Sequence, residues 1–163
     1  APFFLPYLSG ERTPHNDPHI RGSFHSIKTT TDATNMQYSV IEGVSFGILD
    51  GVKSILKVNN NFEKIFMVGG GSRSSFWIQL LASLLDRKLC VCEQSEYGAS
   101  LGVARLAMYV DKNIDDKSTI IKEIKISNEY KPKLNNIDIL LKRYEIWKDL
   151  YSSNKKIAYK LLH

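Results

Sequence analysis

The chain has 163 residues and an ordinary globular composition, with 43% hydrophobic and 24% charged residues. These values exclude collagen-like, disulfide-framework and largely disordered proteins, and a chain of this length holds a core without covalent staples. No apolar run approaches the roughly 18 residues that span a bilayer, and no signal-peptide pattern opens the sequence. We therefore expect a cytoplasmic protein with no membrane partner.

The net charge of +5 is unevenly distributed along the chain. Residues 1–110 carry 10 lysines and arginines against 9 aspartates and glutamates, whereas residues 111–163 carry 12 against 8. The basic segment has helical spacing and no motif that combines basic and aromatic residues. We interpret it as a solvated face and expect no nucleic-acid partner.

Strands and helices alternate in the predicted secondary structure, which favours an α/β fold with a partly parallel sheet. The first helix is expected to begin at a cap formed by Thr31 or Asp32. The predicted elements in chain order are a short strand at 3–8, a loop at 9–22, a strand at 23–27, a helix at 32–57, a strand at 64–68, a helix at 75–85, a strand at 88–93, a helix at 98–110, a weak strand at 124–126 and a helix from 136 to the end. The helix at 75–85 is predicted to bury six side chains, namely Phe76, Trp77, Leu80, Leu81, Leu84 and Leu85.

A glycine-rich turn is the strongest functional signal. Gly69-Gly70-Gly71 follows a predicted buried strand, and Ser72-Arg73-Ser74-Ser75 opens the next helix. Glycines let a ligand approach the bare backbone, and the first N–H groups of a helix suit a phosphate. We interpret the turn as a nucleotide site, although a plain strand-to-helix turn with a serine cap has the same pattern.

Two other nucleotide-binding motifs also place glycines between a strand and a helix. A P-loop requires a lysine at the start of the helix, and none stands there. A dinucleotide site stays open as a minor alternative: Gly69 and Gly71 fit its pattern, and Glu93 ends the next strand, but Ser74 occupies the place of the third glycine.

A stripe of small residues marks one side of the first predicted helix, where Gly43, Gly47 and Gly51 recur every fourth residue. Each interior glycine costs a helix about 1 kcal/mol relative to alanine, so another part of the chain is expected to approach closely. Gly98 and Gly102 give a later helix a matching smooth side, and close helix packing is the favoured interpretation.

The remaining polar clusters are interpreted as structural rather than as catalytic or metal-binding sites. His15, Asp17 and His19 lie in an irregular loop without metal-ligand spacing, so we expect charge pairing of Glu11 or Asp17 with Arg12 or Arg21 instead. The only two cysteines, Cys90 and Cys92, are spaced to point to one side of a strand and are interpreted as buried thiols.

The loop sequence resembles the xylulose kinases of the FGGY carbohydrate kinase family. The resemblance rests on Leu5-Pro6-Tyr7-Leu8-Ser9-Gly10-Glu11-Arg12-Thr13-Pro14-His15-Asn16-Asp17-Pro18 with Arg21-Gly22 after it. A second family signature runs from Gly22 through Ile27 to Asn35-Met36 and Ser39-Val40-Ile41-Glu42, with Ser26 at a place where the family usually has glycine. Val68–Ser74 is similar to the family's adenosine motif, and the similarity continues to Gly102.

This resemblance implies a ribonuclease H-like lobe of the actin/hexokinase (ASKHA) superfamily, with a mixed sheet flanked by helices. Residues 1–163 would be most of the C-terminal lobe, with 1–110 carrying the motifs and 111–163 forming a basic tail that ends in a long helix. The chain opens on Ala1-Pro2-Phe3 and has its first methionine at Met36, which fits part of a longer polypeptide.

The resemblance also implies the ligands. ATP and magnesium are the expected cofactors, D-xylulose the expected sugar, and a homodimer is compatible with it. By motif position the nucleotide-binding residues are Gly69, Gly70, Gly71, Ser72, Arg73 and Ser74, with Arg73 stacking on adenine as in the similar turn of heat-shock ATPases. Glu42 is expected to reach the adenosine pocket.

Three expected parts of the family are missing from the sequence. They are the Gly-Asp motif with the catalytic aspartate, the Ser/Gly/Thr phosphate hairpin and the sugar-binding lobe. We therefore assign no catalytic residue and no metal ligand to residues 1–163, and expect them to bind ATP or ADP weakly and to turn over no sugar alone. Another FGGY sugar kinase, for gluconate or ribulose, and a non-catalytic nucleotide-binding module remain alternatives.

Overall fold

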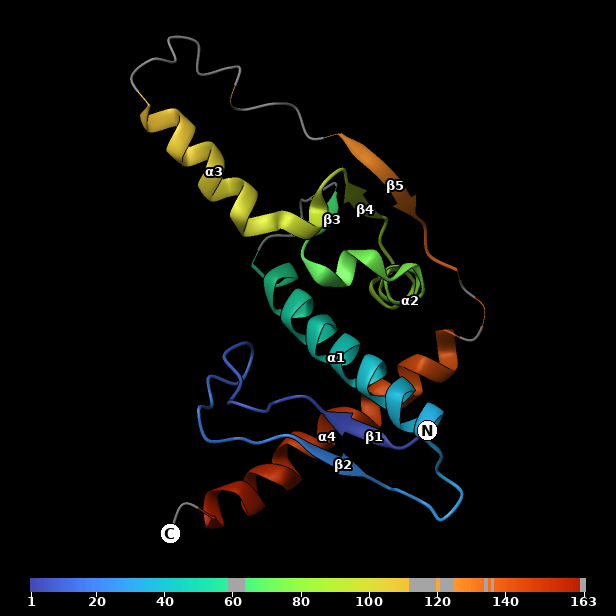
Figure 1. Ribbon diagram of the computed structural model, residues 1–163. Helices are drawn as coiled ribbons and strands as arrows, with labels where there is room; N and C mark the ends of the chain where they lie inside the picture. The colour runs from blue at the N-terminus through green and yellow to red at the C-terminus, as the bar shows by residue number, and fades with distance from the viewer. Residues whose placement is uncertain (59–63, 112–119, 121–124, 134, 136, 162–163) are drawn as a thin grey trace. The chain divides into compact units, whose positions relative to one another are not determined.

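The computed structural model describes residues 1–58, 64–111, 120, 125–133, 135 and 137–161 (Figure 1). Two compact units share the chain. Unit 1 combines Ala1–Asn61 with Leu134–His163, and unit 2 is Phe62–Lys133. The last helix therefore belongs with the first 61 residues, because its aromatic side chains complete their core.

Unit 1 contains a two-stranded antiparallel sheet and two long helices. Strand β1 (Phe3–Leu5) pairs with β2 (Ser23–His25), and the helices are α1 (Ala33–Leu56) and α4 (Ile137–Lys160). As predicted, Asp32 caps α1, where its carboxylate accepts the Asn35 N–H at 2.7 Å.

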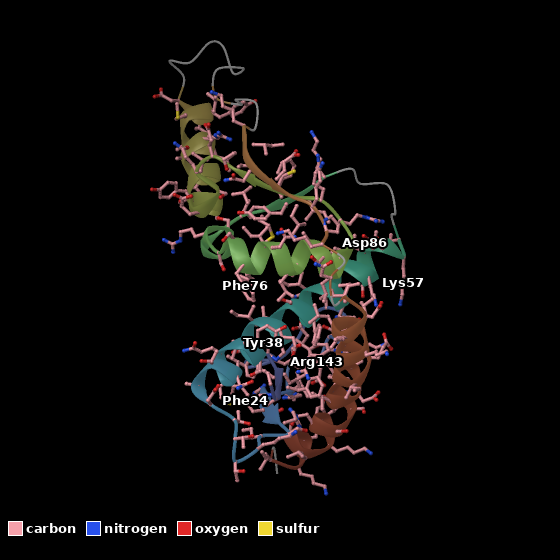
Figure 2. The ribbon with its side chains drawn as sticks, turned by 90° about the vertical axis from the view of Figure 1, so that its right-hand side faces the viewer. Phe24, Tyr38, Lys57, Phe76, Asp86 and Arg143 are labelled. Carbon is pink, nitrogen blue, oxygen red and sulfur yellow. The ribbon has the colours of Figure 1, made fainter. Side chains whose placement is uncertain are left out.

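The core of unit 1 forms where α4 meets α1 and β1, and side chains from the two helices fill the space between them (Figure 2). Trp147 of α4 is 1% exposed, and its indole N–H donates to the Phe4 carbonyl at 2.8 Å. Its ring lies next to those of Tyr144 and Phe46. These contacts attach the end of the chain to its beginning.

Gly43 shows why α1 carries small residues on one side, because strand β1 passes very close to the helix at this position. A Cβ atom at this position would lie 2.2 Å from the carbonyl oxygen of Phe4. The prediction that the stripe packs against a helix is wrong for Gly43, because the backbone of β1 takes that place. At Gly47 the nearest atom to such a Cβ is Pro6 Cγ at 3.6 Å, an ordinary contact.

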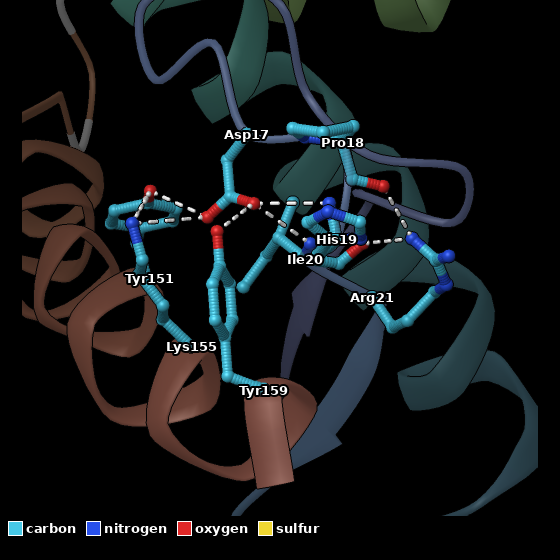
Figure 3. A network of polar contacts seen from close by, with 8 residues as sticks. All are labelled: Asp17, Pro18, His19, Ile20, Arg21, Tyr151, Lys155 and Tyr159. Carbon is cyan, nitrogen blue, oxygen red and sulfur yellow. Dashed lines mark hydrogen bonds and ion pairs between the residues drawn. The ribbon is translucent and has the colours of Figure 1, made fainter. Parts of the chain in front are cut away.

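Asp17 holds the loop that precedes β2 against α4 (Figure 3). Its carboxylate, 2% exposed, accepts the hydroxyls of Tyr151 and Tyr159, both at 2.9 Å, and forms an ion pair with Lys155 at 3.3 Å. The backbone N–H groups of His19 and Ile20 also donate to it. The expected pairing of Asp17 with an arginine is wrong, because the cation comes from α4, more than 130 residues away along the chain.

The arginine and the histidine of the same loop have other partners. The Arg21 guanidinium donates to the backbone carbonyls of Pro18 and Ile20. The His15 ring stacks on that of Tyr151, with centroids 3.6 Å apart. Among the described residues no group of three or more metal-ligating side chains exists.

Ser26 stands in the left-handed region of backbone space, with φ of 62°. The family usually has glycine here, which is the residue that adopts this conformation without steric cost. We expect Ser26→Gly to raise the free energy of unfolding by about 1 kcal/mol, measured by urea denaturation. The control is Ser23→Gly in strand β2, which is expected to lower it by about the same amount. Equal effects of the two changes would contradict the interpretation.

Unit 2 is a three-stranded mixed sheet with two helices. Strands β3 (Ile65–Met67) and β4 (Leu89–Cys92) are parallel, and β5 (Ile126–Tyr130) pairs antiparallel with β4. Helix α2 (Ser75–Leu85) connects β3 to β4, and α3 (Gly98–Val110) follows β4. The predicted α/β lobe with a mixed sheet is confirmed, while the weak strand expected at 124–126 begins at Ile126, and residue 124 lies outside the described residues.

Helix α2 buries only part of the predicted set. Leu81 and Leu84 are buried as predicted, whereas the other members are half-buried or, in the case of Phe76, exposed. Phe76 is 56% exposed and points away from the sheet (Figure 2). The buried positions are Ile78, Leu81, Ala82, Ser83 and Leu84. The prediction is wrong for Phe76, and it left out Ala82 and Ser83, which are buried although they are small. Cys90 is buried as predicted, and Cys92 is half-buried.

Candidate nucleotide-binding site

The glycine turn leaves the carboxyl end of β3 through a backbone conformation that glycine favours. Gly69 has φ of 85° and ψ of −172°, and it precedes a short 3₁₀ helix, η1 (Gly70–Arg73). A Cβ atom added at Gly69 would meet no heavy atom within 4 Å. Glycine is therefore required here by backbone conformation, and the space beside it is open.

The other two glycines have different surroundings. A Cβ atom at Gly70 would lie 3.7 Å from a guanidinium nitrogen of Arg73, so the exposed arginine lies beside the turn. A Cβ atom at Gly71 would lie 2.5 Å from the ring of Trp77. Gly71 is therefore needed for packing against α2, and the open main chain is at Gly69 and Gly70.

Two serines connect the glycine turn to the turn that follows β4. Ser72 is buried, and its hydroxyl donates to the Gly69 carbonyl at 2.7 Å. It also accepts the hydroxyl of Ser95 at 2.8 Å, while the Ser95 carbonyl accepts the Gly69 N–H at 2.8 Å. Ser95 begins a second 3₁₀ helix, η2 (Ser95–Tyr97), so two hydrogen bonds join the turns that follow the parallel strands, and a third holds Ser72 within the glycine turn.

Removal of the Ser72 hydroxyl is expected to destabilise this connection. Ser72→Ala deletes a buried bond to Gly69 and leaves the Ser95 hydroxyl without its acceptor, at a cost of about 1 to 2 kcal/mol in the free energy of unfolding. The control is Ser100→Ala, which removes an exposed hydroxyl bonded to the Tyr97 carbonyl and is expected to change it by less than about 0.5 kcal/mol. Urea denaturation of both variants measures the difference, and a neutral Ser72→Ala would show that the two turns hold without it.

Ser74 caps α2, which is the role that the plain-turn interpretation gives to one of the serines. Its hydroxyl accepts the Trp77 N–H at 3.3 Å, and its own N–H donates to the Gly71 carbonyl at 3.1 Å. The short turn η1 and this cap thus separate the open glycines from the N-terminus of α2. Contacts of Ser72, Arg73 and Ser74 with a nucleotide remain predictions.

A cavity of about 520 Å³ lies at the carboxyl ends of β3 and β4, the edge at which open α/β sheets bind ligands. Arg105 and Lys125 supply its cations and Glu93 its carboxylate, and Phe66, Leu101 and Gly98 are among its other lining residues. Nothing in the sequence pattern marks Lys125 as part of a site. It lies far from the motif along the chain, and only the pairing of β5 with β4 brings it there.

Glu42, also predicted to contact adenosine, lies on α1 in unit 1. Its carboxylate is buried and forms a bidentate ion pair with Arg143 of α4, with both contacts at 2.7 Å. These bonds to Glu42 raise the pKa of Arg143 above its ordinary value, against the effect of burial. The structure therefore gives Glu42 a role in joining α1 to α4, and its contact with adenosine stays a prediction.

No described helix is long and apolar enough to cross a membrane. No site for magnesium is visible as a cluster of acidic side chains in the described part of the chain.

Comparison with known proteins decides the family. The sequence signature of the C-terminal domain of the FGGY family of carbohydrate kinases matches residues 1–110. The chain belongs to the FGGY family. The match contains both the loop around Asp17 and the glycine turn, as the sequence resemblance predicted, and FGGY kinases use ATP.

Named FGGY relatives include several xylulose kinases. That of Staphylococcus epidermidis is 33% identical over 162 residues, which cover 98% of this chain and 32% of the relative. That of Escherichia coli is 30% identical over 149 residues, with 91% and 31% covered. The chain thus spans about a third of the length of the curated relatives it matches.

Solved FGGY structures give the same result. A xylulose kinase from Brucella ovis superposes with a TM-score of 0.79 at 32% identity, covering 96% of this chain and 32% of the other. A gluconate kinase from Lactobacillus acidophilus has a TM-score of 0.69 at 29% identity, with the same shares covered. The fold of residues 1–163 is therefore that of the C-terminal part of these kinases.

Proposed function

We propose that residues 1–163 are the nucleotide-binding C-terminal part of an ATP-dependent kinase that converts D-xylulose to D-xylulose 5-phosphate in the cytoplasm. The observation that carries the nucleotide part is the open main chain at Gly69 and Gly70, at the start of the short turn η1 that leads into α2. The sugar rests on the xylulose kinases among the relatives and on the loop motif around Asp17.

The residues of the turn would act by binding and orienting ATP. The purine nucleoside lies against the backbone at Gly69 and Gly70, where no side chain intervenes, and the planar guanidinium of Arg73 stacks on the base. The partial positive charge at the start of α2 favours the phosphates. Magnesium, when bound to ATP, neutralises charge that develops on the transferred phosphoryl group. The base that deprotonates the sugar is assigned to the part of the protein outside residues 1–163.

Gluconate is the second candidate substrate, because a gluconate kinase from Lactobacillus acidophilus has 29% identity and the same fold.

A dinucleotide site is the alternative for the nucleotide. Glu93 lines the cavity next to the turn, as such a site would require. Ser74, however, stands in place of the third glycine of the dinucleotide motif and caps α2, which favours the adenosine interpretation. A non-catalytic nucleotide-binding module would keep the turn and lack turnover.

The test is ADP formation by the whole polypeptide with ATP, magnesium and one sugar at a time. D-xylulose is expected to give the highest kcat/KM, and gluconate or ribulose a rate lower by at least about tenfold. Turnover with gluconate alone would transfer the assignment to that sugar, and nucleotide binding without turnover would favour the module. Residues 1–163 alone are expected to bind ATP weakly in calorimetric titration and to phosphorylate no D-xylulose.

Arg73 provides a sharper test of the nucleotide site. Arg73→Ala is expected to weaken ADP binding by about tenfold, because the base loses a planar, permanently charged partner. Arg105→Ala is the matched control: it removes the same charge from the cavity wall, and its effect is expected to stay within about twofold. Titration of both variants with ADP measures the two dissociation constants. Equal effects would mean that Arg73 acts through charge alone and does not stack.

A further inference from the structure

The glycine turn is bonded to a buried serine that is not part of its motif. Ser95 lies in the turn after β4, is 6% exposed and begins η2. The residue before it, Gln94, has φ of 60°, in the left-handed region that residues other than glycine adopt at a steric cost. Such a conformation persists where the surrounding structure fixes it. The turn around Ser95 is therefore held in a defined place by the fold.

Ser95 acts on both polar groups of the Gly69 backbone. Its carbonyl accepts the Gly69 N–H at 2.8 Å. Its hydroxyl donates to that of Ser72 at 2.8 Å, and the Ser72 hydroxyl donates to the Gly69 carbonyl at 2.7 Å. A serine hydroxyl has a single proton, so the bond from Ser95 leaves the Ser72 proton directed at Gly69. The hydroxyls of Ser95 and Ser72 thus form a chain of hydrogen bonds that ends on the Gly69 carbonyl.

Gly69 has no packing that would hold it without these bonds. A Cβ atom there would meet no heavy atom within 4 Å, and one at Gly70 would lie 3.7 Å from the end of the flexible Arg73 side chain. Glycine loses more conformational freedom on ordering than any other residue. Without its hydrogen bonds this open main chain would sample several conformations, and a ligand that lies on it would have to order it at a cost in affinity.

We propose that Ser95 is a positioning residue for nucleotide binding, which holds Gly69 and Gly70 in the conformation that the nucleoside contacts. It acts through Gly69 and Ser72 and touches no ligand atom itself. The proposal rests on the proposed nucleotide site and adds to it a residue from outside the glycine motif, contributed by the turn after the neighbouring strand. A serine with a purely structural role would stabilise the fold and leave the affinity for nucleotide unchanged.

The test is Ser95→Ala in the whole polypeptide, which removes the hydroxyl and keeps the carbonyl. The dissociation constant for ADP, measured by calorimetric titration, is expected to rise about fivefold, as the loss of one hydrogen bond from a preorganised site predicts. In steady-state assays KM for ATP is expected to rise by a similar factor, whereas kcat and KM for D-xylulose change by less than about twofold. A loss of stability alone would not divide the constants in this way.

Ser83→Ala is the matched control. Ser83 is likewise buried, and its hydroxyl donates to the Gln79 carbonyl at 2.9 Å and accepts the Lys133 N–H at 3.1 Å, at the other end of α2 from the glycine turn. Both variants are expected to unfold at lower urea concentrations than the native protein, but only Ser95→Ala is expected to bind ADP more weakly. Equal dissociation constants for the native protein and Ser95→Ala, or equal weakening by both variants, would overturn the proposal.

Hydrogen exchange measures the hold on the turn without any nucleotide. The peptide that contains Gly69 and Gly70 is expected to exchange its amide hydrogens at least about threefold faster in Ser95→Ala than in Ser83→Ala. An equal rate would contradict the positioning role, whatever the protein binds. A native protein that bound no ADP would refute the proposed function and the positioning role together, whereas ADP binding that Ser95→Ala leaves unchanged would refute the positioning role alone.

Discussion

Gly43→Ala is expected to lower the free energy of unfolding by about 3 kcal/mol. In an isolated helix the same change would be favourable by about 1 kcal/mol, because alanine is the better helix former. The new methyl group would instead occupy the position of the Phe4 carbonyl, 2.2 Å from its oxygen and 3.0 Å from its carbon. Backbone in a paired strand cannot move as a flexible side chain can, so β1 must shift or separate from α1.

Gly47→Ala, one turn further along α1, is the matched control. The added Cβ would lie 3.6 Å from Pro6, which is ordinary contact, so the helix preference is expected to dominate and to stabilise the protein by roughly 0.5 to 1 kcal/mol. Urea denaturation of the two variants, followed by circular dichroism, measures both values. A Gly43→Ala protein as stable as Gly47→Ala would show that β1 and α1 do not approach as closely as the structure indicates.

The contrast between these two glycines shows which contacts can be predicted from the sequence and which cannot. The four-residue spacing of the stripe predicts correctly that something approaches α1, because interior glycine is costly. It does not say what approaches. The long helices and the strands near the glycine turn are predicted closely, since hydrophobic periodicity, Asp32 and Ser74 are local signals. Contacts that join distant parts of the chain have no such signal.

In the candidate site, too, the residues with local signals were predicted and those from distant segments were not. Gly69 and a serine cap follow from local backbone requirements, and the motif pointed to both, although it did not say which serine is the cap. Ser95, which holds Ser72 in place, and Lys125 at the cavity were not predicted, because each arrives from another strand. Glu42 was assigned to a ligand from its place in the motif, and only the fold shows that Arg143 from α4 is its partner.

Asp17 is the strongest case of a distant contact, and its replacement is expected to have a comparably large effect. Asp17→Asn keeps the shape of the side chain but removes the charge that Lys155 and the hydroxyls of Tyr151 and Tyr159 bind. A buried, hydrogen-bonded ion that loses its charge costs about 3 kcal/mol of the free energy of unfolding at pH 7, since its partners stay in place.

The pH dependence gives a second signature. Burial alone would raise the pKa of Asp17, but the hydrogen bonds from Tyr151, Tyr159, the His19 N–H and Lys155 outweigh it and hold the pKa far below its ordinary value of 3.8. Because the pKa is lower in the folded state, the carboxylate contributes its full stability above the unfolded-state pKa and loses it as the pH falls below about 4. The difference between the native protein and Asp17→Asn is therefore expected to be constant from pH 7 to about pH 5 and to shrink toward pH 3.

Glu129→Gln supplies the control, because Glu129 also loses an ion pair but lies at the surface. Its carboxylate contacts Lys88 at 3.0 Å with both side chains more than a third exposed, so the change is expected to cost less than about 0.5 kcal/mol at any pH. Urea denaturation at pH 7, 5 and 3 measures all three proteins. A difference for Asp17→Asn that stays equally large at pH 3 would mean that its cost comes from shape and not from charge, and the ion pair with Lys155 would then contribute little to holding α4 on the loop.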